Sequence, residues 1–206
     1  GSVPKPGEDV KDEGYFKNVF NMLLFKKEYL FAVAKNKNYT KYGVITVLLI
    51  SLFHVIISWA LLRRAVSNVD LGSQNLGVFP MGAFIYIPLL SLLGVVIYYS
   101  VYNFIARFVM KGKGSGVELF RIISCSSVLG VVSSLFMLLP FEDSGLTKGV
   151  SGIIYLWSVA LLIYSIHKVH KISIGKSVLT FLIPPVILFI IAMLLLRSLF
   201  TPAMFI

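Results

Sequence analysis

Residues 167–189 read HKVHKISIGKSVLTFLIPPVILF and join a short basic turn to an apolar run that contains two prolines. Lysine ammonium groups require water or an anionic partner, whereas the run after Lys176 is almost entirely apolar. These two kinds of residue lie side by side at the edge of a bilayer, where lysine stems lie along the membrane and their charged ends reach the headgroups. The stretch therefore predicts a membrane boundary at this turn.

The composition extends this prediction to the whole chain. Of the 206 residues, 57% are apolar and only 14% are charged, compared with a charged share of roughly 25% in soluble domains. A soluble chain of this length fills one core with far fewer apolar residues, and its helices keep a polar face. We therefore expect an integral membrane protein.

The apolar residues divide into segments of the length that a membrane helix needs, which is about 20 residues. Membrane strands are excluded because they are about 10 residues long and alternate in polarity. The predicted fold class is all-α, a polytopic five-helix transmembrane bundle over residues 43–206 with an N-terminal amphipathic interfacial helix. The predicted spans are residues 43–63, 84–109, 119–139, 149–167 and 177–200.

The positive charges are distributed unequally between the two sides of this bundle. Fifteen of the 19 Lys and Arg residues lie in the N-terminal segment or beside the second and fourth connectors. Only Arg63, Arg64, Lys148 and Arg197 lie on the other side. The positive-inside rule then places the N-terminus in the cytoplasm and the C-terminus outside. Because sidedness explains the net charge of +10, anionic lipid headgroups are the expected partner and nucleic acid is not.

The segment before the first span, residues 15–42, shows helical periodicity over residues 15–35. Its polar stripe faces away from an apolar arc rich in Phe and Leu, although Lys26 and Lys27 interrupt that arc. This pattern favours a helix that lies in the cytoplasmic interface, and a helix packed on the connectors is the alternative. Gly1-Ser2 is typical of a scar left by tag cleavage, and residues 3–14 are expected to form a flexible tail without a signal peptide.

The side chains that carry chemistry are sparse inside the predicted spans. All nine acidic residues lie outside them, and His54 is the only titratable residue deep in a span. The sequence GVSG at 149–152 matches the rhomboid protease motif, but Ser151 and His167 lie about 24 Å apart along one helix. We therefore expect no catalytic residue, no metal site and no cofactor, and we do not expect an enzyme.

The third span is rich in small and weakly polar side chains, a pattern typical of helices that pack closely in membranes. Prolines in the second and fifth spans free carbonyls for neighbouring hydroxyls. Ordinary packing is one interpretation of these residues, and a small cavity or hinge is the other. The single cysteine is expected to be a buried, inert thiol. The candidate packing or cavity residues are His54, Cys125, Ser126, Ser127, Pro184 and Pro185.

Two motifs lie beside the second and fourth connectors: KGKGSGVELFRIISCSS at 111–127 and HKISIGKSVLTFLIPP at 170–185. With these motifs the chain resembles the Yip domain family of integral membrane proteins, over about residues 15 to 200. The resemblance implies a cytoplasmic surface made by the two motifs and their flanks. The candidate residues of this surface are Lys111, Gly112, Lys113, Gly114, Gly116, Phe120, Arg121, His167, His170, Lys171, Ser173, Gly175 and Lys176.

The resemblance also implies a function in membrane organisation or trafficking. Eukaryotic members bind Rab-type GTPases, but this chain lacks the acidic-aromatic Tyr-Gly-Pro motif before its first span and is more similar to the prokaryotic branch. We therefore expect a non-enzymatic scaffold or adaptor in a prokaryotic cell membrane, with membrane shaping as one role. A homo-oligomer and a cytoplasmic protein are its candidate partners. The alternative is a transporter or channel for a small molecule or lipid through the helix bundle.

Overall fold

The computed structural model describes residues 13–67, 82–137 and 145–200, and the predicted tail at 1–14 lies almost wholly outside these ranges. All the regular elements of the described residues are helices, as predicted. They are α1 (Tyr15–Leu23), α2 (Lys27–Lys35), α3 (Asn38–Ser67), α4 (Ala83–Phe104), the π-helix η1 (Ile105–Val109), α5 (Gly116–Ser126), α6 (Leu129–Met137), α7 (Gly145–His170) and α8 (Ile174–Phe200).

Within the described residues, five helical segments are long and apolar enough to cross a membrane, as predicted. They are Asn38–Arg63, Ala83–Val109, Gly116–Phe136, Lys148–His170 and Ile174–Leu195. Each overlaps the predicted range and differs from it by a few residues at the ends, because several helices continue past the apolar core into their polar flanks. The protein is therefore an integral multi-pass membrane protein.

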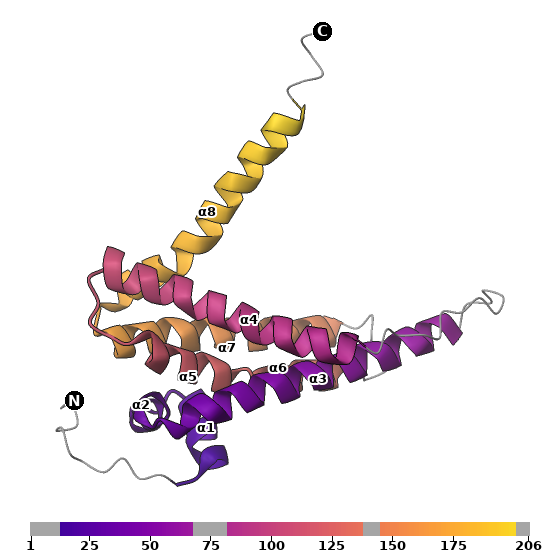
Figure 1. Cartoon of the computed structure of the whole chain (residues 1–206), viewed down its shortest axis with the longest axis horizontal. Coiled ribbons are helices and arrows are strands. Elements are labelled where there is room, and N and C mark those ends of the chain that lie inside the picture. The colour runs from indigo at the N-terminus through magenta and orange to yellow at the C-terminus, as the bar shows by residue number, and fades with distance from the viewer. Residues whose placement is uncertain (1–12, 68–81, 138–144, 201–206) are drawn as a thin grey trace.

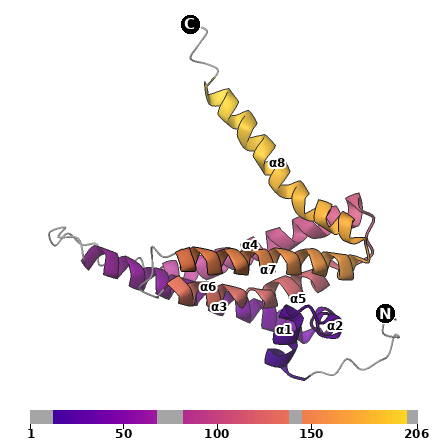
Figure 2. The same ribbon diagram turned by 180° about the vertical axis from the view of Figure 1, so that it is seen from behind.

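Four of the spans run side by side, and the fifth packs on them only through its first turns (Figures 1 and 2). Ser177 and Thr180 on α8 are buried, and the Phe181 ring stacks on Tyr102 of α4. Beyond Pro184 and Pro185, which lie inside α8, the apolar residues from 186 to 195 are exposed. In a membrane protein such residues face lipid, so the outer part of α8 is stabilised by the bilayer rather than by the bundle.

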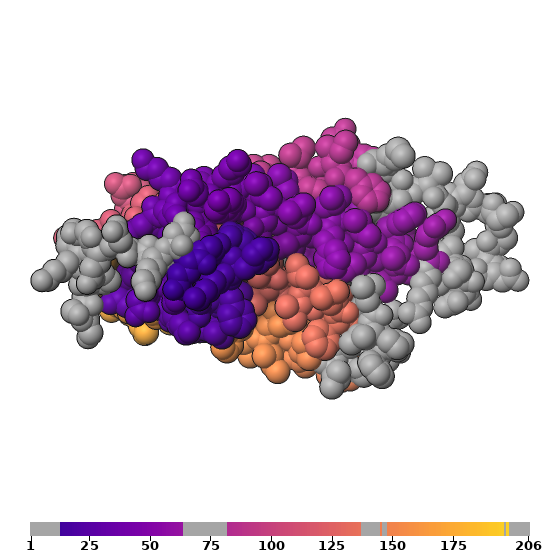
Figure 3. Space-filling model, turned by 90° about the horizontal axis from the view of Figure 1, so that it is seen from below, coloured from indigo at the N-terminus to yellow at the C-terminus, as the bar shows by residue number. Residues whose placement is uncertain are grey.

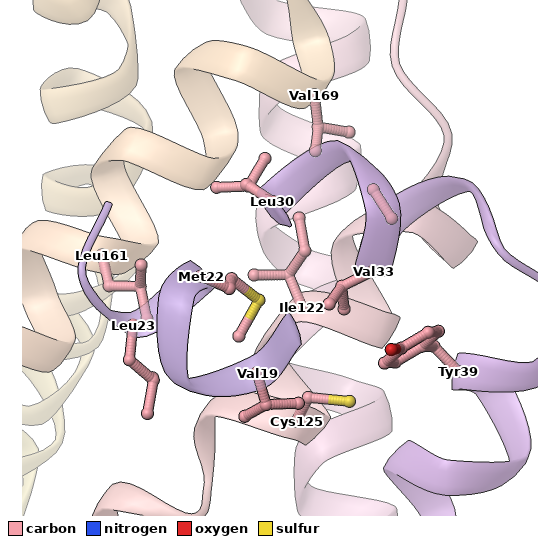
Figure 4. Close-up of a cluster of buried hydrophobic side chains, with 11 residues drawn as sticks. Val19, Met22, Leu23, Leu30, Val33, Tyr39, Ile122, Cys125, Leu161 and Val169 are labelled. Atoms are coloured by element: carbon pink, nitrogen blue, oxygen red, sulfur yellow. The ribbon is translucent and has the colours of Figure 1, made fainter. Parts of the chain in front are cut away.

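The buried core gathers at one end of the bundle, which we call the basic end. It carries the connectors 111–115 and 171–173 together with α1, α2 and residues 24–26, which form the N-terminal hairpin. One cluster of buried side chains joins this hairpin to α3, α5 and α7 (Figure 4). A second cluster joins α4, η1, α5 and α7 and includes Tyr102, Leu119 and Ile166.

The N-terminal segment forms two helices, where the sequence predicted a single one. The chain turns at Phe25, whose φ of 61° is left-handed. The Phe25 amide donates to the Met22 carbonyl and the Lys26 amide donates to the Asn21 carbonyl, which is the hydrogen-bond pattern that commonly ends a helix. The Phe25 ring packs edge-on against Trp157 and Tyr164 of α7. These aromatic contacts offset the cost of a left-handed non-glycine residue.

Helices α3 and α5 approach each other closely at Gly43. A Cβ atom added at this position would lie 2.0 Å from the Ser124 hydroxyl and 2.9 Å from the Ser124 Cβ. Only glycine allows the two backbones to approach this closely, as small residues commonly do in membrane helix pairs. The separation of α3 and α5 at this point is therefore set by Gly43.

We predict that Gly43→Ala lowers the stability of the protein in detergent by about 1–3 kcal/mol, because the added methyl overpacks the contact. A second change, Ser124→Gly, removes the clashing atoms and should restore much of the thermal midpoint. Gly94→Ala is the matched control, since its new Cβ would meet nothing within 4 Å. Equal thermal midpoints for Gly43→Ala and the control would show that the two helices are not in close contact.

Candidate functional site

The two motifs singled out in the sequence lie next to each other at the basic end. The Lys113 amide donates a 3.0 Å hydrogen bond to the carbonyl of His170, and the Gly112 amide donates one of 2.8 Å to Ala106. A Cβ added at Gly114 would lie 2.4 Å from the Val169 carbonyl oxygen, so the glycine loop lies directly against the end of α7. The connectors 111–115 and 171–173 therefore form one continuous surface.

Most of the predicted interaction residues lie on this surface. Lys111, Lys113, Lys171, Ser173, Gly175 and Lys176 are exposed, and Gly112, Gly114, Gly116 and His167 are partly buried. The exposed lysines come from both connectors, so they concentrate positive charge on one end of the bundle. Whether this surface binds a partner stays a prediction.

Three residues predicted for this surface are buried, and the structure corrects their role. Phe120 is 6% exposed and its ring packs against Tyr99 of α4. His170 is fully buried, because the glycine loop passes over it. Arg121 is 9% exposed and points to the N-terminal hairpin. These side chains hold the surface in place, and none of them is available to a partner.

Arg121 joins the hairpin to the bundle through the last turn of α2 and the first turn of α3. Its guanidinium donates hydrogen bonds of 2.6 Å to the Ala34 carbonyl, 3.3 Å to the Lys35 carbonyl and 2.7 Å to the Thr40 hydroxyl. The C-terminal carbonyls of a helix have no partner within it and carry partial negative charge, which a cation satisfies well. Arg121 is thus the charged anchor of the hairpin.

The hairpin packs on α3, α5 and α7, and Figure 3 shows it from below beside α3 (purple) and α7 (orange). At one end the Tyr15 and Thr46 hydroxyls hydrogen-bond, and at the other the Trp157 indole donates to the Leu23 carbonyl at 2.9 Å. Burial raises the pKa of Tyr15 to about 12, so its hydroxyl stays protonated at physiological pH. The periodicity of residues 15–35 does not predict that this segment packs on α7. The signal in the sequence is Trp157, because a buried indole N–H usually finds a hydrogen-bond partner at a contact between elements.

One edge of α1 remains uncovered and forms a ridge of apolar side chains, Phe16, Phe20 and Leu24. Their exposed fractions are 86%, 63% and 46%, and their spacing of four residues aligns them on one face of the helix. Lys17 lies beside the ridge and forms a 3.0 Å ion pair with Glu13. Aromatic and aliphatic side chains next to a lysine are typical of a helix in contact with a bilayer interface.

The candidate cavity residues in the spans are mostly engaged in packing. His54 on α3 donates from Nε2 to the Gly130 carbonyl at 3.2 Å, and Cys125 is fully buried. The Ser126 and Ser127 hydroxyls donate to the carbonyls of Ile123 and Ser124 in the last turns of α5. Pro184 and Pro185 lie on α8, which packs on α4, η1 and α7, whereas the other four residues lie on α3 and at the end of α5. The structure therefore does not bring this set together as one site.

The third span is interrupted near its middle. Residues 127 and 128 separate α5 from α6, and His54 contacts the first turn of α6. The Gly130 amide donates to Ser127 and the Val131 amide donates to Val128, so hydrogen bonds between residues three apart replace the α-helical pattern. The Gly130 carbonyl also accepts a bond from Ser134, so the interruption is satisfied by neighbouring polar groups.

The model of the Yip1 domain matches residues 21–196, which is most of the chain. The chain belongs to the Yip1 domain family. Neither a curated protein nor a solved structure was found to match it. The family match begins within α1 and ends near the end of α8, so the hairpin from Asn21 onward, the glycine loop and all five spans are parts of the Yip1 domain.

We predict that Arg121→Met releases the hairpin from the Yip1 domain. Three hydrogen bonds from a charged group are lost, and the expected destabilisation is about 3 kcal/mol. Arg121→Lys keeps the charge without the planar fork and should give an intermediate loss. Limited proteolysis at residues 24–37 and hydrogen exchange of α1 and α2 measure the release.

Lys113→Met is the control for this prediction, because it removes an exposed cation from the basic end, whereas Arg121 is buried there. We expect its proteolysis and exchange rates to equal those of the wild type. If Arg121→Met also left these rates unchanged, Arg121 would not anchor the hairpin.

Proposed function

We propose that this Yip1 domain protein is a non-enzymatic scaffold or adaptor that organises and shapes the membrane through the N-terminal hairpin and the basic end. The observation that supports the proposal best is the exposed ridge of Phe16, Phe20 and Leu24 on a helix that lies across the spans. Moving such residues from water into lipid contributes about 1.5–3 kcal/mol for each large side chain. The ridge therefore has a strong tendency to enter the bilayer.

In this proposal the basic end faces the cytoplasm. Exposed lysines occur on α2, on the first turn of α3 and on both connectors at this end, and the positive-inside rule assigns such a side to the cytoplasm. Each lysine near an anionic surface contributes about 1 kcal/mol of attraction. The lysines would hold the headgroups while the ridge occupies space among the acyl chains beneath them.

The shaping mechanism rests on an asymmetry between the two ends of the bundle. The hairpin packs on the outside of the spans at the basic end (Figures 1 and 3). It therefore enlarges the cross-sectional area of the protein at that end and not at the other. A protein that is wider in one leaflet than in the other favours curvature toward the narrower side. Several copies in one patch of membrane would add their effects, and a soluble partner on the exposed lysines could control where they gather.

To test the proposal, the full chain is reconstituted into vesicles of phosphatidylcholine and phosphatidylglycerol. The shape of the vesicles is then measured by electron microscopy. We predict that the wild type narrows or tubulates the vesicles and that Phe16→Ser with Phe20→Ser reduces this effect several-fold. Phe108→Ser is the matched control, because Phe108 is 65% exposed at the same end but lies on η1. Vesicles that keep their shape with the wild type, or an effect that survives the double substitution, would overturn the proposal.

Transport through the bundle is the second candidate function. The interruption of the third span beside His54 favours it, since discontinuous helices and intramembrane titratable residues are common in transporters. Sealed vesicles that hold a pH gradient separate the two functions. We predict that the wild type and His54→Leu dissipate the gradient equally slowly. A proton leak that His54→Leu abolishes would favour transport over the scaffold.

A further inference from the structure

An apolar groove of about 460 Å³ lies between α1 and the junction of α5 and α6. One wall is formed by α1 and includes Phe16 and Phe20 of the ridge, and the floor is Val128 in the interruption of the third span. Ligand sites in proteins have volumes of about 300–1,000 Å³ and mostly apolar walls, so the groove has the size of a binding site. Its lining residues are Tyr15, Phe16, Lys17, Val19, Phe20, Leu23 and Val128.

The position of the groove along the spans determines what can reach it. Val128 lies twelve residues beyond Gly116, the start of the third span, and therefore about 18 Å along the helix. The Leu23 carbonyl accepts its hydrogen bond from Trp157, which lies thirteen residues from the end of the fourth span at His170, or about 20 Å. A hydrocarbon core is about 30 Å thick, so the groove opens among acyl chains.

We propose that this groove binds one acyl chain of a phospholipid, whose phosphate group lies at Lys17. The proposal deepens the function proposed above and rests on the hairpin lying in the bilayer. An engineered cavity of about 150 Å³ holds a benzene molecule, so the groove has room for a segment of several methylene groups. A soluble peptide would have to leave backbone polar groups unsatisfied at this depth, which excludes it as the occupant.

Lys17 provides the polar end of the site. Its stem lines the groove while its ammonium group reaches outward to Glu13, as lysines commonly do at membrane boundaries. The Lys17 side chain is 59% exposed, whereas Glu13 is 24% exposed and also accepts a 2.8 Å hydrogen bond from the Tyr29 hydroxyl. Because an ammonium group has three donors, Lys17 can donate to a phosphodiester on its exposed side while Glu13 stays in place. The acyl chain would then lie along the groove toward Val128, and the Lys17 stem would extend from the groove to the phosphate group.

A lipid bound here would be shared by the hairpin and the bundle, because the groove is lined by α1 on one side and by Val128 on the other. Its acyl chain would replace contacts that the ridge otherwise makes with mobile lipid. The lipid would therefore hold α1 on the spans from outside, while Arg121 holds α2 from inside.

The test uses the full chain in vesicles that contain a phospholipid with a photoreactive group near the end of one acyl chain. We predict labelling concentrated on Tyr15–Leu23 and Val128, and at least about tenfold weaker labelling of α1 in Val128→Trp, which fills the groove. Leu24→Ala is the control, because Leu24 belongs to the ridge but does not line the groove. It should keep the labelling of the wild type.

Val128→Phe is a smaller filling substitution that should lower the labelling in the same direction if Val128→Trp does not fold. Native mass spectrometry gives a second measurement, in which the wild type retains one phospholipid and the filled variants lose it. Labelling spread evenly over all exposed spans and unchanged in the filled variants would mean an adventitious lipid only. Retention of a free fatty acid or detergent in place of a phospholipid would also overturn the proposal.

The outcomes separate this inference from the function on which it rests. The filled variants keep Phe16, Phe20 and Leu24, so their vesicle shaping should equal that of the wild type. Shaping without groove labelling would overturn the lipid site alone. Groove labelling in vesicles that keep their shape would overturn the scaffold function and leave the lipid site standing.

Discussion

The Arg121 guanidinium contacts the end of α2 and the start of α3 at the same time, from a position on α5. Without a cation there, the last carbonyls of α2 would be buried beside apolar side chains and unsatisfied. With it, α2 ends against the bundle, and the buried side chains of the hairpin, such as Met22 and Leu30, can pack on α5 and α7 (Figure 4). The position of α1 and its ridge follows from this one charged group.

The two ends of the bundle are stabilised in different ways. At the basic end the helices are joined by protein contacts, including the glycine loop on α7 and the hairpin across the spans. Along α4 and the outer part of α8 the apolar side chains are exposed, and lipid must cover them. The protein-packed end thus positions the candidate site, while the bilayer supports the remaining helices.

The hairpin has a packed inner face, as in a soluble domain, and an exposed apolar outer edge, as in a membrane protein. Its inner face is a packed core with hydrogen bonds from Asn18 to Tyr39 and from Trp157 to Leu23. Its outer edge exposes Phe16 and Phe20. Because the inner contacts fix α1 across the spans, the outer edge has a defined position and direction relative to the spans. This fixed geometry distinguishes it from a free amphipathic helix, which settles wherever lipid packing allows.

The membrane class, the five spans and the end at which the lysines gather could be predicted from the order of the residues, because these depend on the length of apolar runs and on charge counts along the chain. The same reasoning located the glycine loop and the turn at 171–173. The packing of the folded chain was needed to show that Phe120, Arg121 and His170 are buried, that the N-terminal segment is a hairpin and that Phe16 and Phe20 lie beside Val128. These features depend on contacts between residues distant in sequence, such as Arg121 with Ala34, and periodicity along one helix does not encode them.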